Sequence, residues 1–322
     1  MKALVTGATG FVGSHLVEAL RQREDEVTAL VRSPGKAAFL AQLGVRQVPG
    51  DLGDRAALDR AAEGQDVVFH VAGLVAARSE AEFLDVNRGG TARVLEAASR
   101  GRVSRFVLIS SMAAGGPSSP GQPRTGNEPA RPVTAYGRSK LAAEEVVRAG
   151  QVPWTILRPP MVYGPRDREL LKVFRAARIG FAPVFGDGSQ ELSAVHGADL
   201  AQAAVAGATA PGAAGRIYYP CHPRTFTSAG FVRAVGAALG RRVVVVRISE
   251  PLGRLALSVV GRVARAAGHA TVLGLDKANE FFQTAWTGDP APFTRDTGWT
   301  SAHDLEPGLA QTAQWYRSNG WI

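Results

Sequence analysis

The sequence predicts an α/β fold, in which a doubly wound parallel sheet is joined to a smaller, mostly helical C-terminal lobe. In about the first 160 residues, short apolar runs alternate with stretches whose apolar residues recur at helical spacing. Strand, helix and strand repeated in this way indicate a parallel sheet covered on both faces. From residue 159 the chain becomes richer in proline and glycine, and residues 223–322 resemble helices separated by turns. This change of pattern predicts the second lobe.

The predicted strands and helices follow one another in a regular order. The strands are "KALVTG", "EVTALVR", "DVVFHVAG", "RFVLISS" and "WTILRP", and residues 54–63 and 81–100 are helices between them. Residues 193–208 and 216–220 are expected to return to the sheet as a helix and a strand. The expected domains are therefore residues 1–158 plus about 193–222, and about 159–192 plus 223–322.

Composition places the chain among ordinary globular proteins. It has 322 residues, of which 45% are hydrophobic and 20% are charged. The lone cysteine, Cys221, excludes an internal disulfide framework and suits a reducing compartment. The opening "MKALVTGATG" enters a strand pattern at once and leaves no room for a signal peptide, so a cytoplasmic location is expected.

The chain is strongly basic, with a formal net charge of +9. Its basic residues are scattered, and neither zinc-ligand spacing nor an aromatic-basic RNA motif accompanies them. We therefore expect no metal and no nucleic-acid partner. A basic surface also attracts polyphosphate cofactors and anionic membranes, so the charge alone leaves these two partners open.

A glycine-rich loop joins the first strand to the first helix in "VTGATGFVGSHLVEAL" (5–20). Glycine permits positive φ in the turn, close approach of the backbone to a pyrophosphate, and close packing of the helix on the strand. The helix N-terminus adds unpaired N–H groups and a partial positive charge. The spacing predicts a dinucleotide site rather than an ordinary turn, and its expected residues are Gly7, Thr9, Gly10, Phe11, Val12 and Gly13.

The end of the second strand, "VTALVRSPGK", indicates which dinucleotide is preferred. A carboxylate there accepts hydrogen bonds from both ribose hydroxyls, whereas an arginine pairs with the 2′-phosphate of NADP. The strand ends on Arg32, with Ser33 and Lys36 close by and no acidic residue. NADP is therefore favoured, and NAD stays possible. After the third strand, Asp51 and Leu52 are expected near the adenine, although Asp51 could equally cap a helix.

Tyr136 and Lys140 lie four residues apart in "TAYGRSKLAAEE" (134–145), in the first turns of a predicted helix. Lysine and tyrosine each occur only five times in the chain, so chance rarely produces this spacing. Residues at i and i+4 share one helix face, so the Lys140 ammonium can lie beside the phenol and lower its pKa from about 10 toward neutrality. Tyr136 could then exchange a proton with a substrate oxygen.

With the glycine loop, the "HVAG" and "LISS" segments and the Tyr136/Lys140 pair, the sequence resembles the extended short-chain dehydrogenase/reductase family. The resemblance covers nearly the whole chain, including "RPPMVYGP" (158–165), "GDGSQ…VHGADLA" (186–201) and the tail "TGWTSAHDLEPGLAQTAQWYRSNGWI". It implies a Rossmann fold, an NAD(P) cofactor, a substrate-binding second lobe and a homodimer. The sequence is most similar to dihydroflavonol reductase-like and 3β-hydroxysteroid dehydrogenase-like members.

The resemblance also assigns roles to single residues. Ser111, 25 residues before Tyr136, is expected to hydrogen-bond the substrate oxygen that Tyr136 protonates, and Lys140 is expected to hold the nicotinamide ribose. Hydride moves between the cofactor and the substrate carbon, while the protein supplies orientation and a proton. Small residues should pass beneath the cofactor and prolines should border its nicotinamide: Val71, Ala72 and Gly73, and Pro159 with Pro160. Structural roles are expected for His70, Asn87 and His196.

Two positions depart from the nucleotide-sugar epimerases and dehydratases of this family. Those enzymes tend to have Arg-x-x-Asn-Val-Tyr-Gly-Pro and Gly-Asp-Gly-x-Gln-x-Arg, in which the Asn and the last Arg contact the diphosphate. This chain has Met161 and Leu192 at those places. As substrate-binding residues they favour a small molecule with an apolar carbonyl or alcohol group. A nucleotide-sugar epimerase or dehydratase, and a non-catalytic nucleotide-sensing protein, are the alternatives.

The segment "PLGRLALSVVGRVARAAG" (251–268) is a predicted amphipathic helix. Six apolar residues share one helical face and three arginines share another: Leu252, Leu255, Ala256, Val259, Val260 and Val263, and Arg254, Arg262 and Arg265. The segment is too short and too charged to span a bilayer. We expect its apolar face to pack on the core of the smaller lobe. A lid over the substrate and weak docking to an anionic membrane surface are the alternatives.

Overall fold

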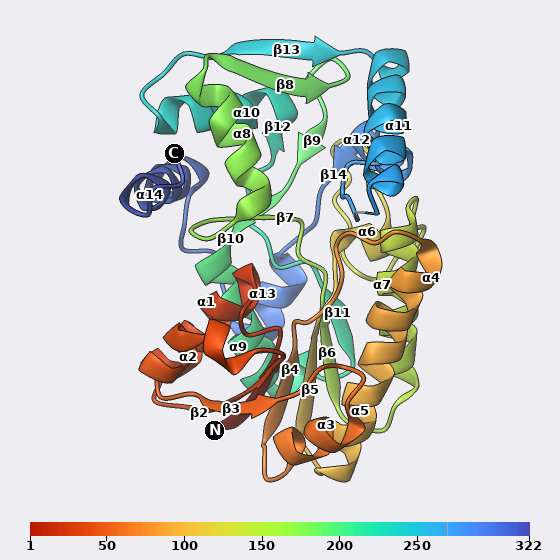
Figure 1. Cartoon of the computed structure of the whole chain (residues 1–322), viewed down its shortest axis with the longest axis vertical. Coiled ribbons are helices and arrows are strands. Elements are labelled where there is room, and N and C mark those ends of the chain that lie inside the picture. Colours follow the sequence, from red (N-terminus) through yellow and green to blue (C-terminus); the bar gives the residue numbers. More distant parts are fainter. Residues whose placement is uncertain (269) are drawn as a thin grey trace.

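Seven parallel strands form the central sheet, in the order β11-β6-β5-β4-β1-β2-β3 (Figure 1). The computed structural model describes residues 1–268 and 270–322, without the side chains of Lys36 and Arg265, so the expectations for these two side chains lie outside the description. The strands are β1 Lys2–Thr6, β2 Glu26–Val31, β3 Arg46–Pro49, β4 Val67–His70, β5 Arg105–Ile109, β6 Trp154–Leu157 and β11 Arg216–Tyr218. The predicted doubly wound α/β fold is confirmed, including the return of residues 216–218 to the sheet.

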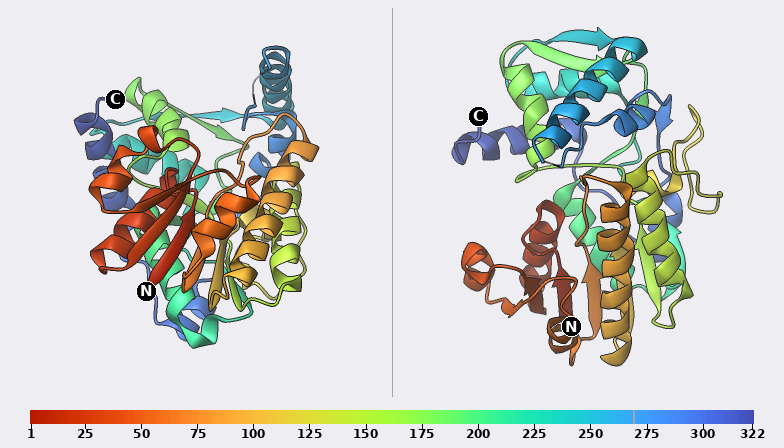
Figure 2. Two further views of the ribbon diagram at one scale, coloured as in Figure 1. Left: turned by 60° about the horizontal axis from the view of Figure 1, so that its bottom comes forward. Right: turned by 45° about the vertical axis from the view of Figure 1, so that its right-hand side comes forward.

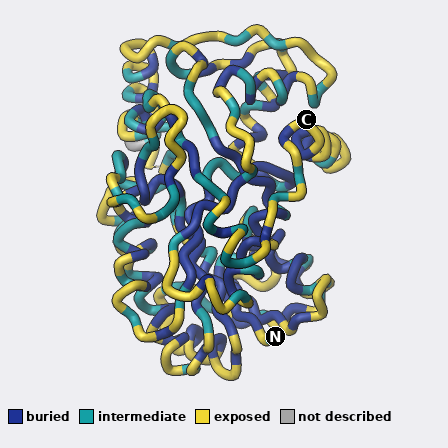
Figure 3. Tube along the Cα trace, turned by 180° about the vertical axis from the view of Figure 1, so that it is seen from behind, coloured by how far each residue is buried: buried dark blue, intermediate teal, exposed yellow. Residues whose placement is uncertain are grey.

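Helices cover both faces of the sheet (Figure 2). One face carries α1 Phe11–Gln22, α2 Ala38–Gln42, α9 Gly197–Thr209 and α13 Ala291–Thr297; the other carries α3 Arg55–Ala62, α5 Gly90–Arg100 and α7 Ala135–Ala149. Successive residues of a strand face opposite sides, and the strand residues follow this rule: Ala3 and Val5 join the apolar cluster under α1, whereas Leu4 joins the cluster under α3 and α5. Both faces are thus buried (Figure 3), which explains why the strands are continuous apolar runs.

Short elements complete this part of the chain. They are the 3-10 turns Pro34–Lys36 and Pro211–Ala213, α4 Glu80–Phe83, a π-helical turn at Leu84–Gly89, and α6 Met112–Gly115. The π-helical turn joins α4 to α5, so the predicted helix 81–100 is one nearly continuous helical segment with an irregular middle.

A second region lies beyond the carboxyl ends of the strands (Figure 1). It contains β7 Met161–Tyr163, α8 Arg168–Arg178, β8 Phe181–Phe185, β9 Glu191–Leu192, β10 Ala194–His196, β12 Phe226–Thr227, α10 Ser228–Ala238, β13 Val244–Ile248, α11 Glu250–Ala266, the turn Leu275–Lys277, α12 Ala278–Phe281, β14 Ala285–Trp286 and α14 Leu305–Ser318. Its own apolar cluster is built on side chains such as Phe174, Phe231 and Tyr316. This separate core supports the two-domain division, whose boundaries stay a proposal. Short strands also occur among the helices expected over 223–322.

The orientation of α11 is opposite to the one we expected from the sequence. Residues 250–266 form the predicted helix, but the leucines and valines of its apolar face are exposed to solvent. The helix instead packs through Gly253, Leu257 and Gly261, which are buried. Two of these are glycines, which lack the side chains that a hydrophobicity pattern detects, and so the sequence pattern pointed to the wrong face. None of the helices in the described part of the chain has the length and apolar character needed to cross a bilayer.

Candidate active site

The glycine loop lies where the strand order reverses, between β1 and β4. Gly7, directly after β1, has φ +74°, and a Cβ there would lie 2.7 Å from the backbone nitrogen of Ala72, which follows β4. The same Cβ would lie 3.1 Å from the carbonyl carbon of Val71. Glycine is therefore required at position 7 by both conformation and space. In open α/β sheets, ligands bind outside the carboxyl ends of the strands at this switch point.

The N-terminus of α1 is free to bind an anion. Its N-cap, Gly10, has no side-chain hydrogen bond, so the first N–H groups of the helix are available to a ligand. A Cβ on Gly13 would lie 2.1 Å from the carbonyl oxygen of Gly7, so glycine is needed to seat the helix on the loop. Thr9 and Gly10 are exposed, and Phe11 and Val12 are partly buried. This arrangement fits the pyrophosphate of a dinucleotide.

The predicted adenosine contacts lie at the ends of β2 and β3. Arg32 follows β2 directly, is exposed, and pairs with no carboxylate of the described residues. Asp51 accepts hydrogen bonds from the backbone N–H groups of Gly53 (2.7 Å) and Asp54 (3.2 Å). It therefore stabilises the turn, whereas the cap of α3 is Asp54, which accepts from the backbone N–H of Ala57.

Leu52 packs on the start of α5. A Cβ on Gly90 would lie 2.8 Å from the Leu52 side chain, so the two residues are in close contact. Leu52 also borders the apolar cluster beneath α3 and α5. Its observed contacts are those of a packing residue, and an additional contact with the adenine stays a prediction.

Lys140 reaches from α7 to the carboxyl end of β5. Its Nζ donates a hydrogen bond to the carbonyl oxygen of Ile109 at 2.8 Å. A Cβ on Gly73 would lie 3.7 Å from the same Nζ, so the loop after β4 runs beside the ammonium group. Burial lowers the pKa of Lys140 to about 8, while Glu144 acts in the opposite direction. Lys140 is thus held between the ends of two adjacent strands.

Tyr136 lies one turn before this lysine on α7, and Ser111 follows the end of β5. The Ser111 side chain caps α6, accepting from the backbone N–H of Ala113 at 3.2 Å, and is close enough to the Tyr136 phenol to act on its pKa. Burial raises the pKa of Tyr136 to about 12, the hydrogen bond of Ser111 acts in the opposite direction, and the charge of Glu280 adds to the rise. This is opposite to the lowering that we expected from Lys140, because loss of water around the phenolate dominates.

The helix that carries Tyr136 has a strong start signal. Thr134 is its N-cap and accepts from the backbone N–H of Gly137 at 3.1 Å. Thr134 also donates to the buried carboxylate of Glu280 at 2.8 Å, and the backbone N–H of Ala135 donates to Asp276 at 2.8 Å. Two carboxylates of the second region thus bind the helix end next to Tyr136. We did not identify either residue from the sequence, because both lie far from residue 136 along the chain.

The remaining expected site residues lie around this centre. The carbonyl of Pro159 accepts from the backbone N–H of Met112 at 2.9 Å, which places it beside Ser111. Met161, two residues later, is in β7 and borders the core of the second region. Leu192 pairs in β9 with Trp286, whose indole Nε1 donates to the carbonyl of Glu280 at 2.9 Å. The two apolar positions therefore belong to different small sheets.

A buried ion pair joins α7 to the end of β6. Glu144 and Arg158 are 0% and 3% exposed, and two hydrogen bonds of 2.6 and 2.9 Å join them. Ser110 also donates to Glu144, and Arg158 donates to the Tyr219 hydroxyl at 3.0 Å. Sequence analysis missed this pair, although Glu144 lies at i+4 from Lys140 and therefore on its helix face.

The residues expected to be structural have structural contacts. Asn87 accepts from the backbone N–H of Leu74 at 2.7 Å and donates to Ser139 at 2.9 Å, so it joins the β4 loop to α7. His70 hydrogen-bonds Thr6 and Thr91 within the core. His196 caps α9 through the backbone N–H of Ala198.

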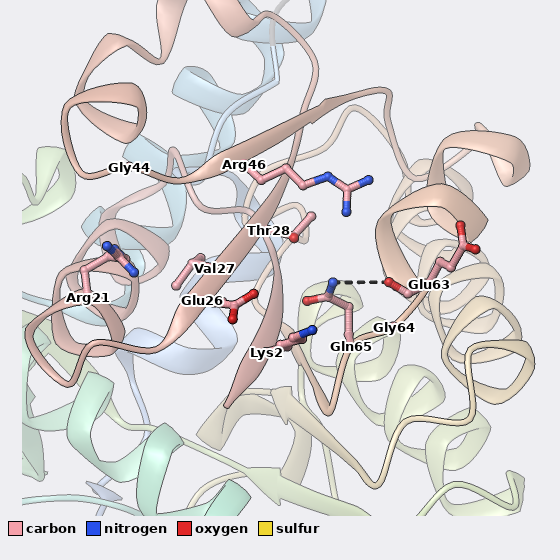
Figure 4. A pocket seen from close by; sticks show the side chains of 10 residues that line it. All are labelled: Lys2, Arg21, Glu26, Val27, Thr28, Gly44, Arg46, Glu63, Gly64 and Gln65. Atoms are coloured by element: carbon pink, nitrogen blue, oxygen red, sulfur yellow. Dashed lines mark hydrogen bonds between the residues drawn. The ribbon is translucent and has the colours of Figure 1, made fainter.

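A pocket of about 460 Å³ lies at the opposite, amino ends of β1, β2 and β3 (Figure 4). Charged side chains surround it, among them Lys2, Glu26 and Arg46. Neither the glycine loop nor Tyr136 contributes to it. Because ligands of such sheets bind at the carboxyl ends, we place the candidate active site there and not in this pocket. No group of three or more His, Cys, Asp or Glu residues among the described positions could hold a metal ion.

Comparison with known proteins identifies the family. The model of the NAD dependent epimerase/dehydratase family matches residues 3–219, more than half of the chain. The protein belongs to this family. The predicted membership of the extended short-chain dehydrogenase/reductases is confirmed, and the protein is an NAD(P)-dependent enzyme.

Individual relatives include reductases and sugar-nucleotide-binding proteins. The ceramide reductase of Caulobacter vibrioides is 36% identical over 320 residues, covering 99% of this chain and 95% of the relative. The 3 beta-hydroxysteroid dehydrogenase/Delta 5-->4-isomerase of Mycobacterium tuberculosis is 32% identical over 277 residues, covering 79% and 73%. The structure of MoeE5 in complex with UDP-glucose and NAD superposes with a TM-score of 0.78 at 26% identity, covering 99% of both chains. These comparisons do not distinguish NADP from NAD.

Proposed function

We propose that the protein is an NADPH-dependent reductase of an apolar carbonyl compound, in which Tyr136 is the proton donor. The observation that carries this proposal is the grouping of three residues: Tyr136 and the buried Lys140 lie one turn apart on α7, and Ser111 is close enough to the Tyr136 phenol to act on its pKa. The Tyr136 phenol is protonated at neutral pH at its ordinary pKa of about 10, and burial, which raises that pKa, keeps it so; it is therefore in the form that can donate a proton to a carbonyl oxygen. The second predicted direction, alcohol oxidation, would require the phenolate.

The residues at the carboxyl ends of the strands fit a dinucleotide. The loop at Gly7, Gly10 and Gly13 would hold the pyrophosphate, Arg32 the 2′-phosphate, and Lys140 the nicotinamide ribose. A bound nicotinamide cofactor supplies the hydride. The protein's own part is to hold the substrate carbonyl oxygen with Ser111 and to transfer the Tyr136 Oη proton to it.

The apolar side chains of Met161 and Leu192 support an apolar substrate. A diphosphate beside them would lose its polar partners, at a cost of several kcal/mol and at least about a hundredfold in affinity. Two relatives that cover much of the chain are named for ceramide and for hydroxysteroids, both large apolar molecules. The first substrate class to test is therefore a large lipid molecule that carries a ketone group, of ceramide or steroid type.

One observation favours a second function. MoeE5, whose structure contains UDP-glucose, has the same fold at 26% identity. A nucleotide-sugar epimerase or dehydratase is therefore the alternative. The cytoplasmic location and the homodimer stay predictions.

The test follows NADPH consumption with ceramide-type ketones, ketosteroids, aryl ketones, 3-oxoacyl compounds and UDP-sugars. Turnover of an apolar ketone is expected, and Tyr136→Phe should lower single-turnover hydride transfer by about 10²–10⁴-fold while cofactor still binds. Saturable binding of a UDP-sugar, with no turnover of any apolar ketone, would instead favour the nucleotide-sugar epimerase or dehydratase function. Equal rates in wild type and Tyr136→Phe would remove Tyr136 from the chemistry.

A further inference from the structure

The apolar face of α11 has no covering element among the described residues. Five of its large apolar side chains are between 43% and 64% exposed, although they recur at the spacing of a single helix face: Leu252, Leu255, Val259, Val260 and Val263. The helix stands at the outer edge of the second region (Figure 1). Singly exposed leucines are ordinary, but a continuous apolar stripe over three turns marks an interaction surface.

The stripe is exposed although the helix is firmly attached through its other side. A Cβ on Gly253 would lie 2.6 Å from the Phe282 ring and 3.1 Å from the Phe185 ring. Leu257 is buried, and Gly261 lies beside Gly274. Because small residues bring this side of α11 against the protein, the apolar stripe must face outward.

The charges around the stripe are positive. Residues 251–268 contain no aspartate or glutamate, and Arg262, which precedes Val263, is exposed. Glu250, at the start of the helix, is paired with Arg254 at 2.8 Å. The chain as a whole carries a net charge of +9. An apolar stripe next to a basic side chain matches the headgroup boundary of an anionic membrane, where Arg262 would meet the phosphates.

We propose that α11 docks on the surface of an anionic lipid bilayer, with Leu252, Leu255, Val259, Val260 and Val263 inserted at the boundary between headgroups and acyl chains. A second copy of this chain fits the stripe less well, because a stable interface buries about 800 Å² and about 20–30 residues on each partner. This surface offers only a few side chains of one helix, which is sufficient for reversible interfacial binding.

The docking helix is linked to the start of α7 through the segment that follows it. The segment that follows α11 contains Asp276 and Glu280, which hydrogen-bond Ala135 and Thr134 at the start of α7. Tyr136 is the next residue. A membrane bound by α11 would therefore lie near the side of the site where α7 begins. Docking does not depend on the proposed substrate, since it rests only on the α11 surface.

The experiment is co-sedimentation of the full-length protein with vesicles of phosphatidylcholine alone or mixed with phosphatidylglycerol. The wild type should bind the anionic vesicles, and rising salt should weaken the binding. Leu255→Glu/Val259→Glu should reduce the partition coefficient by about tenfold or more. The matched control is Ile179→Glu/Val244→Glu, which adds the same charge at two apolar residues that are at least as exposed as the pair in α11. Val244 lies at the start of β13, and α11 begins only after the other end of that strand. This control should bind as the wild type does.

Thermal melting of both double variants shows that they are folded, which is expected because all four side chains are exposed. No binding of wild type to anionic vesicles, or equal loss in both variants, overturns the proposal. A concentration-dependent dimer in light scattering that only Leu255→Glu/Val259→Glu abolishes, without vesicle binding, would assign the stripe to a second copy instead. Sedimentation needs no substrate, so its result is independent of whether the reductase proposal holds.

Discussion

The buried ion pair between Glu144 and Arg158 allows a direct measurement of how burial changes the effect of an ion pair on the free energy of unfolding. Glu144→Gln removes the negative charge and leaves the shape nearly unchanged. The Arg158 guanidinium, 3% exposed, would then be an uncompensated buried charge. Breaking a buried pair in this way costs about 3–5 kcal/mol in free energy of unfolding.

The chain contains a matched control in Glu80 and Arg138. Their two hydrogen bonds measure 2.6 and 2.9 Å, the same lengths as in the buried pair, but the side chains are 43% and 45% exposed. Glu80→Gln should therefore cost less than about 1 kcal/mol. Urea unfolding of the three proteins at neutral pH measures both values. A Glu144→Gln loss no larger than that of Glu80→Gln would refute the reasoning, because burial would then have no effect.

The same variant reports on Lys140. The charge of Glu144 raises the pKa of Lys140, so its removal should shift that pKa further below about 8. A pH profile of cofactor binding should move in the same direction in Glu144→Gln and stay in place in Glu80→Gln. A loss of stability without this shift would show that Glu144 acts only on the fold.

Three further changes have defined outcomes. The wild type should bind NADPH about tenfold or more tightly than NADH, since one charged contact is worth roughly 1.5–3 kcal/mol, and Arg32→Asp should reverse this preference. Calorimetric titration of both cofactors measures the two affinities. Equal affinities in the wild type would contradict the prediction. Gly13→Ala should abolish cofactor binding in the same titration, because its Cβ would lie 2.1 Å from the Gly7 carbonyl oxygen; wild-type affinity would contradict this. Burial lowers the pKa of His15 and of His196 from 6.5 to about 4. Below pH 6.5 the unfolded chain therefore binds more protons than the folded protein does. The free energy of unfolding should fall as the pH falls from about 6.5 to 4, by up to roughly 1.4 kcal/mol per pH unit for each histidine. Asp167, whose pKa burial raises to about 6, changes the stability in the opposite sense over part of this range. Urea unfolding at stepped pH should therefore compare wild type with His15→Gln, because the difference between them reports on the histidine alone. The free energy of unfolding should depend less steeply on pH in His15→Gln.

The sequence by itself determined the local features of the site. The spacing of Gly7, Gly10 and Gly13 between a strand and a helix, and the i, i+4 spacing of Tyr136 and Lys140, are properties of neighbouring residues. Their local geometry follows from the periods of the strand and the helix. The sheet was predictable for the same reason, because a strand buried on both faces must be apolar throughout.

Only the tertiary structure decided how these features are surrounded. The direction of the Tyr136 pKa shift depends on the surrounding groups, which include Ser111 and the distant Glu280. The partner of Glu144, on α7, is Arg158, which follows the end of β6. The apolar face of α11 is exposed because Gly253 meets Phe185 and Phe282. Burial depends on which distant segments meet, and residue spacing along one segment carries no information about that contact.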